Sequence, residues 1–546
     1  MAENLRVKSS EFIDETIRVS FKFNGKEYYG FKGDTLASAL LANNVHLVGR
    51  SFKYHRPRGI MTAGSEEPNA IVQVNDNTDR TEPNVRATEL EIYEGLEASS
   101  QNCWPSVNFD IGGINNVISP FLPAGFYYKT FMWPASFWEK YEYFIRHSAG
   151  LGKSPKDKDP DIYDHRYIHC DVLVVGAGIS GILAAKNAAK NNLKTLLVDE
   201  KNELGGATIY QNREFNKIEN QSSSDWIKKE IQELKNLKNL EIKTRTSVAA
   251  FHGYNYLLAR ENLTDHLEKK EKQGKIRQRL LKIRAKKVIL ATGALERPLI
   301  FNNNDRPGIM LSSAVKKYAD FYGVVSGKKN VFFTNNDSAY ESALCLHNKG
   351  IKVEAVIDIR ENSGSKIVKA VKDAGIPIHW SHTIVDTKGY KRLNSISAMK
   401  LSNDGSSVTG SKIDIVCDCL GVAGGWTPAV HLFTQSGGKL TFDETNKVFL
   451  PNKYPSEQIS VGSCNGDFKI KEIINNLSIN LKEFLNIEKT DFDNVTVESE
   501  DDNSKRNIWL LPSDKPLGKT KPFVDYQNDA TAKDIKLALR EGFRSI

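Results

Sequence analysis

The chain has 546 residues, which is too long for one ordinary domain and predicts three or four units that each bury a core. Hydrophobic residues make up 40% and charged residues 26%, close to globular averages, so neither a disordered nor a fibrous class is favoured. The net charge of +8 is spread through lysine-rich stretches with interleaved acids, such as 228–238 and 269–287, which we expect to be solvated helical faces. No motif that recognises the grooves of a nucleic acid accompanies this positive charge, so nucleic-acid binding is not expected.

Cysteine usage and hydropathy indicate the compartment. The six cysteines are few for this length and include no C-x-x-C pair. They favour a reducing compartment over a disulfide framework. Residues 1–10 lack an apolar core segment, and no later stretch approaches the roughly 20 apolar residues that span a bilayer. We therefore expect a cytoplasmic protein without membrane contact.

The first elements are a hairpin and a short helix. Residues 17–23 alternate apolar and polar, and Asn24-Gly25 supplies the positive backbone angles of a tight turn. Asp34-Thr35 can cap a helix over Leu36–Ala42, whose apolar spacing fits one buried stripe. A basic run follows at 50–59.

This hairpin, helix and loop order resembles a plant-type ferredoxin fold, in which the basic loop would hold an iron–sulfur cluster through cysteines. The chain has no cysteine before Cys103. We predict a ferredoxin-like α+β domain over residues 1–100 that has lost its cluster. His55 of the loop could bind an anion together with Arg56 and Arg58, but we interpret it as a solvated loop histidine.

Residues 101–165 are predicted to form an aromatic-rich connector. Aromatic side chains crowd residues 121–144, which we interpret as a packed wedge between domains, with a contact for another subunit as the alternative. The polar stretch 152–161 that follows is predicted to be a linker.

A dinucleotide motif opens the next domain, predicted to begin at 166 and to run to 325. The buried run Asp171–Val175 leads into Gly176-Ala177-Gly178-Ile179-Ser180-Gly181 and a helix-forming stretch over Ile182–Asn191. Strand, glycine turn and helix come in the order of a Rossmann unit. The glycines permit the tight turn, the approach of backbone to a pyrophosphate and close helix packing, and the helix N-terminus offers N–H groups to the phosphates.

Acids and further glycines extend this site. A strand over Lys194–Val198 ends at Asp199-Glu200, where a carboxylate accepts from a ribose hydroxyl and disfavours a 2′-phosphate. NAD or FAD is therefore favoured over NADP. Gly205-Gly206 follows the acids, and Thr292-Gly293 closes a strand over Lys287–Leu290. The combination is similar to the two-dinucleotide-binding architecture of glutathione reductase.

A second Rossmann-like domain is predicted over 326–420, with a strand at Asn330–Phe333, a helix at Ser338–Asn348 and a strand at Val353–Asp358. Thr334, Asn336 and Ala339 stand at its glycine positions, where their Cβ atoms would obstruct a pyrophosphate. This domain is therefore expected to keep the fold without the ligand.

Residues 421–487 are predicted to return to the first dinucleotide-binding domain through a motif from Val461 to Gly466. Related flavoenzymes have an aspartate after the first glycine of this motif, and Ser463 takes its place here, which favours NAD over FAD. Residues 488–546 are predicted to be a linker toward a missing domain.

Catalytic constellations are not evident. The redox-active cysteine pair of a disulfide reductase is missing between Cys170 and Cys345, so that activity is excluded. Cys417, Cys419 and Cys464 are expected to pack in the core. We find no Ser–His–Asp order, carboxylate pair or metal cluster.

Long phrases outside these motifs carry a family resemblance. They lie at residues 33–40, 49–59, 64–69, 126–134, 277–285 and 521–534. The chain resembles the alpha subunits of heterotetrameric sarcosine oxidases over nearly its whole length. The resemblance implies an assembly with beta, gamma and delta subunits that demethylates sarcosine to glycine with O2 as acceptor and tetrahydrofolate as one-carbon carrier.

In that family the beta subunit holds FAD and oxidises the amine, FMN lies at the alpha–beta boundary, and alpha carries NAD. The resemblance places NAD, with FAD as the alternative, on these residues: Gly176, Ala177, Gly178, Ile179, Ser180, Gly181, Asp199, Glu200, Gly205, Gly206, Thr292, Gly293 and Gly466. No amine-oxidising residue is transferred to this chain.

Family alpha subunits continue into a folate-binding domain similar to an aminomethyltransferase. This chain stops before it, as a truncated reading frame or one half of a split subunit. Two alternatives remain open: a related subunit of an opine dehydrogenase or hydrogen cyanide synthase type enzyme, and a non-catalytic assembly subunit with a structural nucleotide.

Overall fold

The computed structural model describes residues 5–75, 80–119, 133–148, 150–210, 216–498 and 505–544. The chain divides into two compact units. Unit 1 contains residues 1–160, 298–425 and 504–546, and unit 2 contains residues 161–297 and 426–503. Within the described ranges, no helix has the length and apolar character needed to cross a membrane.

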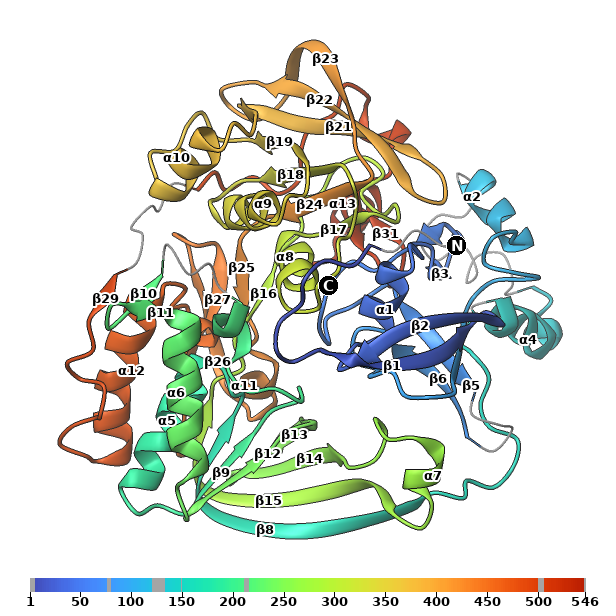
Figure 1. The fold of residues 1–546 in the computed structure, drawn as a ribbon. Coiled ribbons are helices and arrows are strands. Elements are labelled where there is room, and N and C mark those ends of the chain that lie inside the picture. The colour runs from blue at the N-terminus through green and yellow to red at the C-terminus, as the bar shows by residue number, and fades with distance from the viewer. Residues whose placement is uncertain are drawn as a thin grey trace. The chain divides into compact units, whose positions relative to one another are not determined.

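Unit 1 begins with the predicted hairpin, β1 (Asp14–Phe23) and β2 (Lys26–Lys32), whose turn residues Asn24 and Gly25 have φ of 52° and 74°. Helix α1 (Leu36–Ala42) starts after Thr35, whose side chain accepts from the N–H of Ser38, and every residue of the helix is buried. The strands form a mixed sheet in the order β2-β1-β7-β5-β6, with β5 at Ile71–Asn75, β6 at Thr81–Arg86 and β7 at Leu96–Ser100. The predicted ferredoxin-like fold is confirmed (Figure 1).

The second part of unit 1 is a five-stranded parallel sheet in the order β17-β24-β18-β19-β20. Its strands are β17 (Ile309–Leu311), β18 (Asn330–Thr334), β19 (Val353–Asp358), β20 (Ile378–Trp380) and β24 (Cys419–Ala423). Helices α8 (Ser312–Asp320), α9 (Ser338–Asn348) and α10 (Lys366–Asp373) accompany it, with an antiparallel layer of β21 (His382–Gly389), β22 (Leu393–Leu401) and β23 (Val408–Val416).

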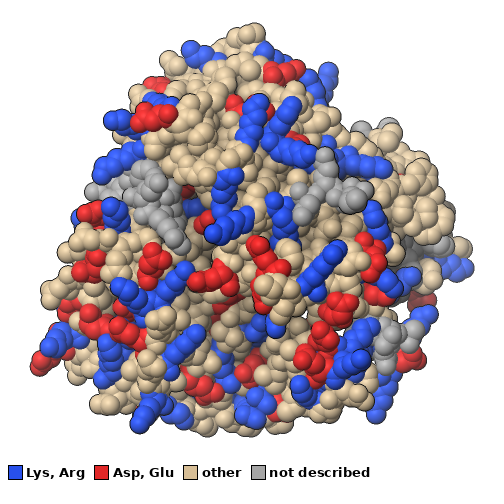
Figure 2. Space-filling view, in the orientation of Figure 1, with Lys and Arg blue, Asp and Glu red and all other residues tan. Residues whose placement is uncertain are grey.

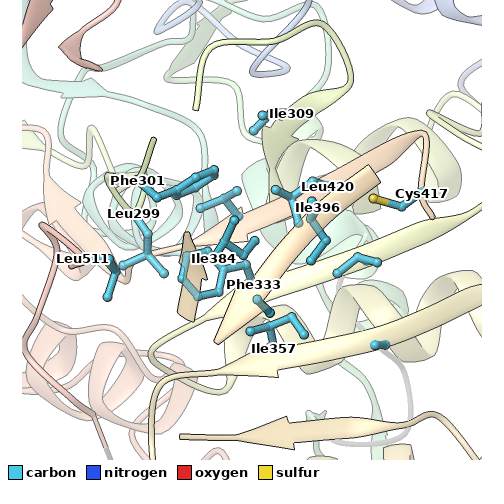
Figure 3. Packing of buried hydrophobic residues seen from close by; sticks show 14 of the residues in the cluster. Leu299, Phe301, Ile309, Phe333, Ile357, Ile384, Ile396, Cys417, Leu420 and Leu511 are labelled. Carbon is cyan, nitrogen blue, oxygen red and sulfur yellow. The ribbon is translucent and has the colours of Figure 1, made fainter. Parts of the chain in front are cut away.

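Of the range 488–546 predicted as a linker, residues 488–503 belong to unit 2 and residues 504–546 to unit 1. Leu511 lies in the core with Leu299 and Phe301, as Figure 3 shows. Strands β30 (Phe523–Asp525) and β31 (Ala530–Thr531) and helix α13 (Ala532–Arg540) follow. The contacts of this segment join residues far apart in the chain, such as Leu510 with Ile300, and the local sequence does not report them.

Unit 2 contains the parallel order β12-β9-β8-β15-β28. Its strands are β8 (Ile162–Val175), β9 (Thr195–Val198), β12 (Leu240–Lys243), β15 (Ile276–Leu290) and β28 (Gln458–Ser460), with β13 (Thr246–His252) and β14 (Tyr256–Asn262) antiparallel beside β15. Helices α5 (Ile179–Lys190), α6 (Ser223–Lys235) and α12 (Ile470–Leu485) pack together (Figure 1). The predicted fold class is confirmed.

The structure differs from two further expectations based on the sequence, one for residues 269–287 and one for residues 121–144. The stretch 269–287 is helical only at α7 (Lys269–Lys272), and most of it lies in β15, where alternate side chains are buried. Much of the aromatic stretch 121–144 lies outside the described residues, but Trp133 is 85% exposed and Tyr143 is 51% exposed, so these two side chains do not pack in a wedge. Basic and acidic side chains interleave on the face drawn in Figure 2.

Candidate functional site

The glycine turn between β8 and α5 is required by packing. Gly176 has φ of 98°, and an added Cβ would lie 2.3 Å from the carbonyl oxygen of Ala291. A Cβ on Gly181 would lie 1.8 Å from the carbonyl oxygen of Gly176. Helix and strand can approach this closely only if both positions lack a side chain.

Gly178 has a different environment. It is the N-cap of α5, no side chain caps the helix there, and no acid stands in the first turn. An added Cβ would meet nothing within 4 Å. Ile179 and Ser180 begin the helix, so their N–H groups lie in its first turn. An uncapped helix N-terminus next to a glycine fits a phosphate group.

The second glycine pair closes onto this turn. The N–H of Gly205 donates to the carbonyl oxygen of Ala177 at 2.8 Å, and Gly178 and Gly205 form a parallel bridge. A Cβ on Gly206 would lie 2.9 Å from the Cα of Gly178. The structure thus brings both glycine motifs together, as their spacing predicts.

The two acids after β9 have separate roles. Asp199 accepts from the N–H of Ala177 at 2.6 Å and of Lys201 at 2.8 Å, so it shapes the turn. Burial raises the pKa of the Asp199 carboxyl. Glu200 is exposed at the carboxyl end of the strand. Of the pair, Asp199 is therefore used by the turn, and Glu200 is the more exposed carboxylate.

Thr292 and Gly293 lie beside the turn. The N–H of Ala291 donates to the carbonyl oxygen of Val175 at 2.8 Å, which joins β15 to β8. The Thr292 hydroxyl donates to the carbonyl oxygen of Ala429 at 2.8 Å, and Gly293 has φ of 74°. Thr292 therefore fixes the backbone here, and its hydroxyl is engaged within the protein.

The return motif reaches the site through a residue that sequence reasoning missed. A Cβ on Gly462 would lie 2.1 Å from the Oγ of Ser180 in α5. Gly466, the predicted glycine, instead packs against Leu450, whose Cδ2 would lie 2.8 Å from an added Cβ. The signal that could have found Gly462 was its position two residues after the end of β28, as the first glycine of the same motif.

The parallel sheet of unit 1 lacks these features. Asp358, at the end of β19, is fully buried and accepts from the Tyr340 hydroxyl and the Arg360 N–H, each at 2.8 Å. The Thr334 hydroxyl donates to the carbonyl oxygen of Asn336 at 2.7 Å. The carboxylate that would meet a ribose is thus engaged internally.

The chain's own C-terminal segment covers the carboxyl edge of that sheet. Arg506 exchanges hydrogen bonds with Asn335, after β18, and donates to the carbonyl oxygen of Ile359, after β19, at 2.8 Å. The Trp509 indole donates to the carbonyl oxygen of Gly424, after β24, at 2.7 Å. Ligands of open parallel sheets bind at this edge, so the segment stands where a second nucleotide would lie.

Thiol and metal chemistry have no evident centre in the described chain. Cys417, Cys419 and Cys464 are buried, as expected, and all six cysteines are free thiols. The Cys464 thiol donates to the carbonyl oxygen of Leu290 at 3.1 Å. Among the described residues, no group of three or more His, Cys, Asp or Glu side chains is placed to hold a metal ion.

Comparison with family models covers most of the chain. Residues 170–455 match the model described as pyridine nucleotide-disulphide oxidoreductase, which is more than half of the chain. The chain belongs to the pyridine nucleotide-disulphide oxidoreductase family. Beside this family core, residues 17–103 match a 2Fe-2S iron-sulfur cluster binding domain and residues 519–546 match a sarcosine oxidase A3 domain.

Curated relatives of this oxidoreductase confirm the predicted resemblance. It is 40% identical to the sarcosine oxidase subunit alpha of Rhizobium meliloti (strain 1021), over 99% of this chain and 53% of the relative. It is 33% identical to that of Corynebacterium sp. (strain P-1), over 98% of this chain and 51% of the relative. The chain spans about half the length of the curated relatives it matches.

Among solved structures, the L-proline dehydrogenase from P. horikoshii shares the fold, with a TM-score of 0.63 at 20% identity. The match covers 100% of this chain and 88% of that one.

Proposed function

We propose that this oxidoreductase chain is the NAD-binding part of the alpha subunit of a multisubunit, flavin-dependent amine oxidase of the sarcosine oxidase kind. The open position at Gly178, beside the uncapped N-terminus of α5, carries the nucleotide part of this proposal. The sarcosine oxidase alpha subunits at 40% and 33% identity support the enzyme class.

The residues of unit 2 would hold the nucleotide in defined ways. The backbone of Gly178, Ile179 and Ser180 would bind the pyrophosphate, and Glu200 would accept from a ribose hydroxyl and repel a 2′-phosphate. Ser463 in place of the flavin-binding aspartate favours NAD over FAD. Bound NAD supplies a nicotinamide that can accept hydride, and this chain holds and orients it.

We assign amine oxidation to a partner. In the proposed complex a beta subunit holds FAD and oxidises sarcosine to glycine with O2 as acceptor, and FMN lies at the boundary with this chain. Gamma and delta subunits complete the assembly, and folate chemistry belongs to the part of the relatives that this chain does not span.

A pair of glycine substitutions tests the nucleotide site. Gly178→Ala adds a methyl group that clashes with nothing in the protein but lies where the pyrophosphate would approach. Gly253→Ala adds a methyl group to an exposed position in the same unit, also with nothing within 4 Å.

The co-expressed complex is purified for wild type and both variants, and released cofactors are separated by chromatography. We expect NAD from wild type and Gly253→Ala, and at least tenfold less from Gly178→Ala at an unchanged melting temperature. Equal NAD in all three proteins would refute the site, and FAD in its place would correct the cofactor.

A second candidate is an assembly subunit with a structural nucleotide, which the buried thiols and the lack of a metal-holding group in the described residues favour. Anaerobic addition of sarcosine to the complex separates the two. Reduction of the bound NAD supports the electron-handling role, whereas flavin reduction with unchanged NAD supports the structural role. Turnover of nopaline or octopine instead of sarcosine would indicate the opine dehydrogenase type.

A further inference from the structure

In unit 1, the loop after the basic run closes around one buried carboxylate. Glu67 is only 2% exposed. Its Oε2 accepts from the N–H groups of Met61 at 2.9 Å and Thr62 at 2.6 Å, and its Oε1 accepts from those of Asn69 at 2.8 Å and Ala70 at 2.9 Å. Four backbone donors of one loop therefore converge on a single anionic group.

Such convergence is typical of a loop that encloses an anion. Charge-assisted hydrogen bonds from backbone N–H groups are stronger than neutral ones, and four of them compensate for much of the cost of burying a carboxylate. Burial raises the pKa of Glu67, while the same N–H donors oppose that rise because they favour the ionised form.

The spacing of the loop matches a cluster-binding pattern. Plant-type ferredoxins carry their first three cluster thiolates in the spacing C-x4-C-x2-C, and backbone groups donate to the cluster sulfurs. Thr62, Glu67 and Ala70 have this spacing, inside the region that matches the 2Fe-2S cluster binding model. None of the three can supply a thiolate, so the residues present do not fit an iron–sulfur cluster.

A fourth position faces the same loop. Thr88 is 5% exposed, and its hydroxyl donates to the carbonyl oxygen of Gly64 at 2.7 Å. The N–H of the preceding Ala87 donates to the carbonyl oxygen of Ala70 at 2.9 Å. Thr88 and Ala87 thus hydrogen-bond to the same loop that the Glu67 carboxylate closes.

We infer that the Glu67 carboxylate stands in for the lost cluster, as the internal anion that collects the N–H groups of the former cluster loop. The sequence prediction had placed the cluster loop at residues 50–59, and the hydrogen bonds place it at residues 61–70. This inference concerns unit 1 alone and does not depend on the nucleotide site of unit 2.

The first test is Glu67→Gln in the full chain, with Glu66→Gln as the matched control because Glu66 is its exposed neighbour. The glutamine amide keeps the shape but points an NH2 group at two donors. We expect hydrogen exchange in residues 59–71 to be at least tenfold faster in Glu67→Gln than in wild type, with Glu66→Gln unchanged. Equal exchange in all three proteins would overturn the inference.

The second test restores thiols and remains informative if Glu67→Gln fails to fold. The full-chain variant T62C/E67C/A70C/T88C is incubated anaerobically with ferric iron and sulfide, beside T62C/A70C/T88C, which retains Glu67. We expect about two bound irons per chain and a reducible 2Fe-2S signal in the first variant only. No cluster in the folded first variant, or equal clusters in both, would overturn the inference.

Discussion

Arg56 and Arg58 belong to the basic run at residues 50–59, and the structure buries both. Arg56 donates to Asp305 at 2.6 Å, and Arg58 pairs with Asp305 at 2.6 Å and with Asp529. His55 contacts Asp110 at 2.8 Å and is 7% exposed, so the interpretation as a solvated histidine is wrong. The anions that these residues bind belong to the same chain.

Asp305 should make acid stability depend on this cluster. Burial opposes its charge, but Arg56 and Arg58 outweigh that and lower the pKa of Asp305 to about 2 from 3.8. A depressed carboxyl pKa contributes stability above pH 4 that is lost as the pH falls toward 2. We expect Asp305→Asn to destabilise the protein by about 3 kcal/mol at pH 7, because two buried guanidinium groups lose a partner.

Denaturant titrations at pH 5 and pH 3 check the sign. The difference in the free energy of unfolding between wild type and Asp305→Asn should shrink by about 1 kcal/mol at the lower pH. The exposed Asp373→Asn in α10 serves as control, with a change within about 0.5 kcal/mol at both pH values. A constant or growing difference for Asp305→Asn would contradict the assigned pKa.

At the scale of elements, the segment from Lys505 to Leu511 contacts two parts of unit 1, although it has almost no regular secondary structure. Ile300 and Leu510 form a parallel bridge, and the N–H of Leu511 donates to the carbonyl oxygen of Ile300 at 2.9 Å. The segment joins the core on one side and covers the carboxyl edge of a parallel sheet on the other.

Adjacent leucines provide a matched pair for this element. Leu511 is 5% exposed and Leu510 is 47% exposed. We expect Leu511→Ala to lower the free energy of unfolding by about 2–4 kcal/mol, because it leaves a cavity in the core. Leu510→Ala should change it by less than about 1 kcal/mol, and equal effects in urea denaturation would show that the segment does not anchor the core.

At the scale of the whole molecule, the two parallel sheets differ in what stands at their carboxyl edges. Unit 2 presents an open glycine turn, and the sheet of unit 1 is covered by residues of its own unit. Only one nucleotide is therefore expected per chain, although the fold contains two Rossmann-like sheets.

Hydrogen exchange with NAD checks this assignment. At a ligand concentration of about 100 times Kd, binding stabilises the native state by about 2.7 kcal/mol. We expect slower exchange in residues 176–182 and 199–206 and no change in residues 334–339. Protection at 334–339 would place the nucleotide in unit 1, against the proposal.

The six thiols should be inert across the molecule. Burial raises the pKa of Cys103 and Cys345 to about 11 and that of Cys170 and Cys417 to about 12, and it raises those of Cys419 and Cys464 as well. Because the thiolate is the reactive species, we expect no alkylation by iodoacetamide within minutes at pH 7.5, and six modified thiols after denaturation, by mass spectrometry. Rapid alkylation of the folded chain would show that at least one thiol is reactive, although the cysteine pair of a disulfide reductase is missing.

Features that depend on neighbouring residues were predictable from the sequence. The Asn24-Gly25 hairpin, helix α1, helix α9 and strand β19 lie where apolar spacing and turn chemistry place them. The glycine turn could also be predicted, because strand, glycines and helix follow each other directly. Fold class and family resemblance follow from such local patterns.

Tertiary structure decided the rest, because the deciding contacts join residues far apart in the chain. Arg56 and Asp305 are separated by 249 positions, and Arg58 and Asp529 by 471. Gly462 and Ser180 lie close together although they are far apart in the chain. The same is true of Arg506 and Trp509 and the sheet residues that they cover.

Glu67 combines a feature of the local sequence with a feature that only the tertiary structure supplies. Its spacing from Thr62 and Ala70 is written in the sequence, but only the folded loop turns four N–H groups toward its carboxylate. The local sequence determined which helices and strands form. The orientation of buried polar groups depends on the whole packed loop, and it determined that the N–H groups of this loop bind an anion.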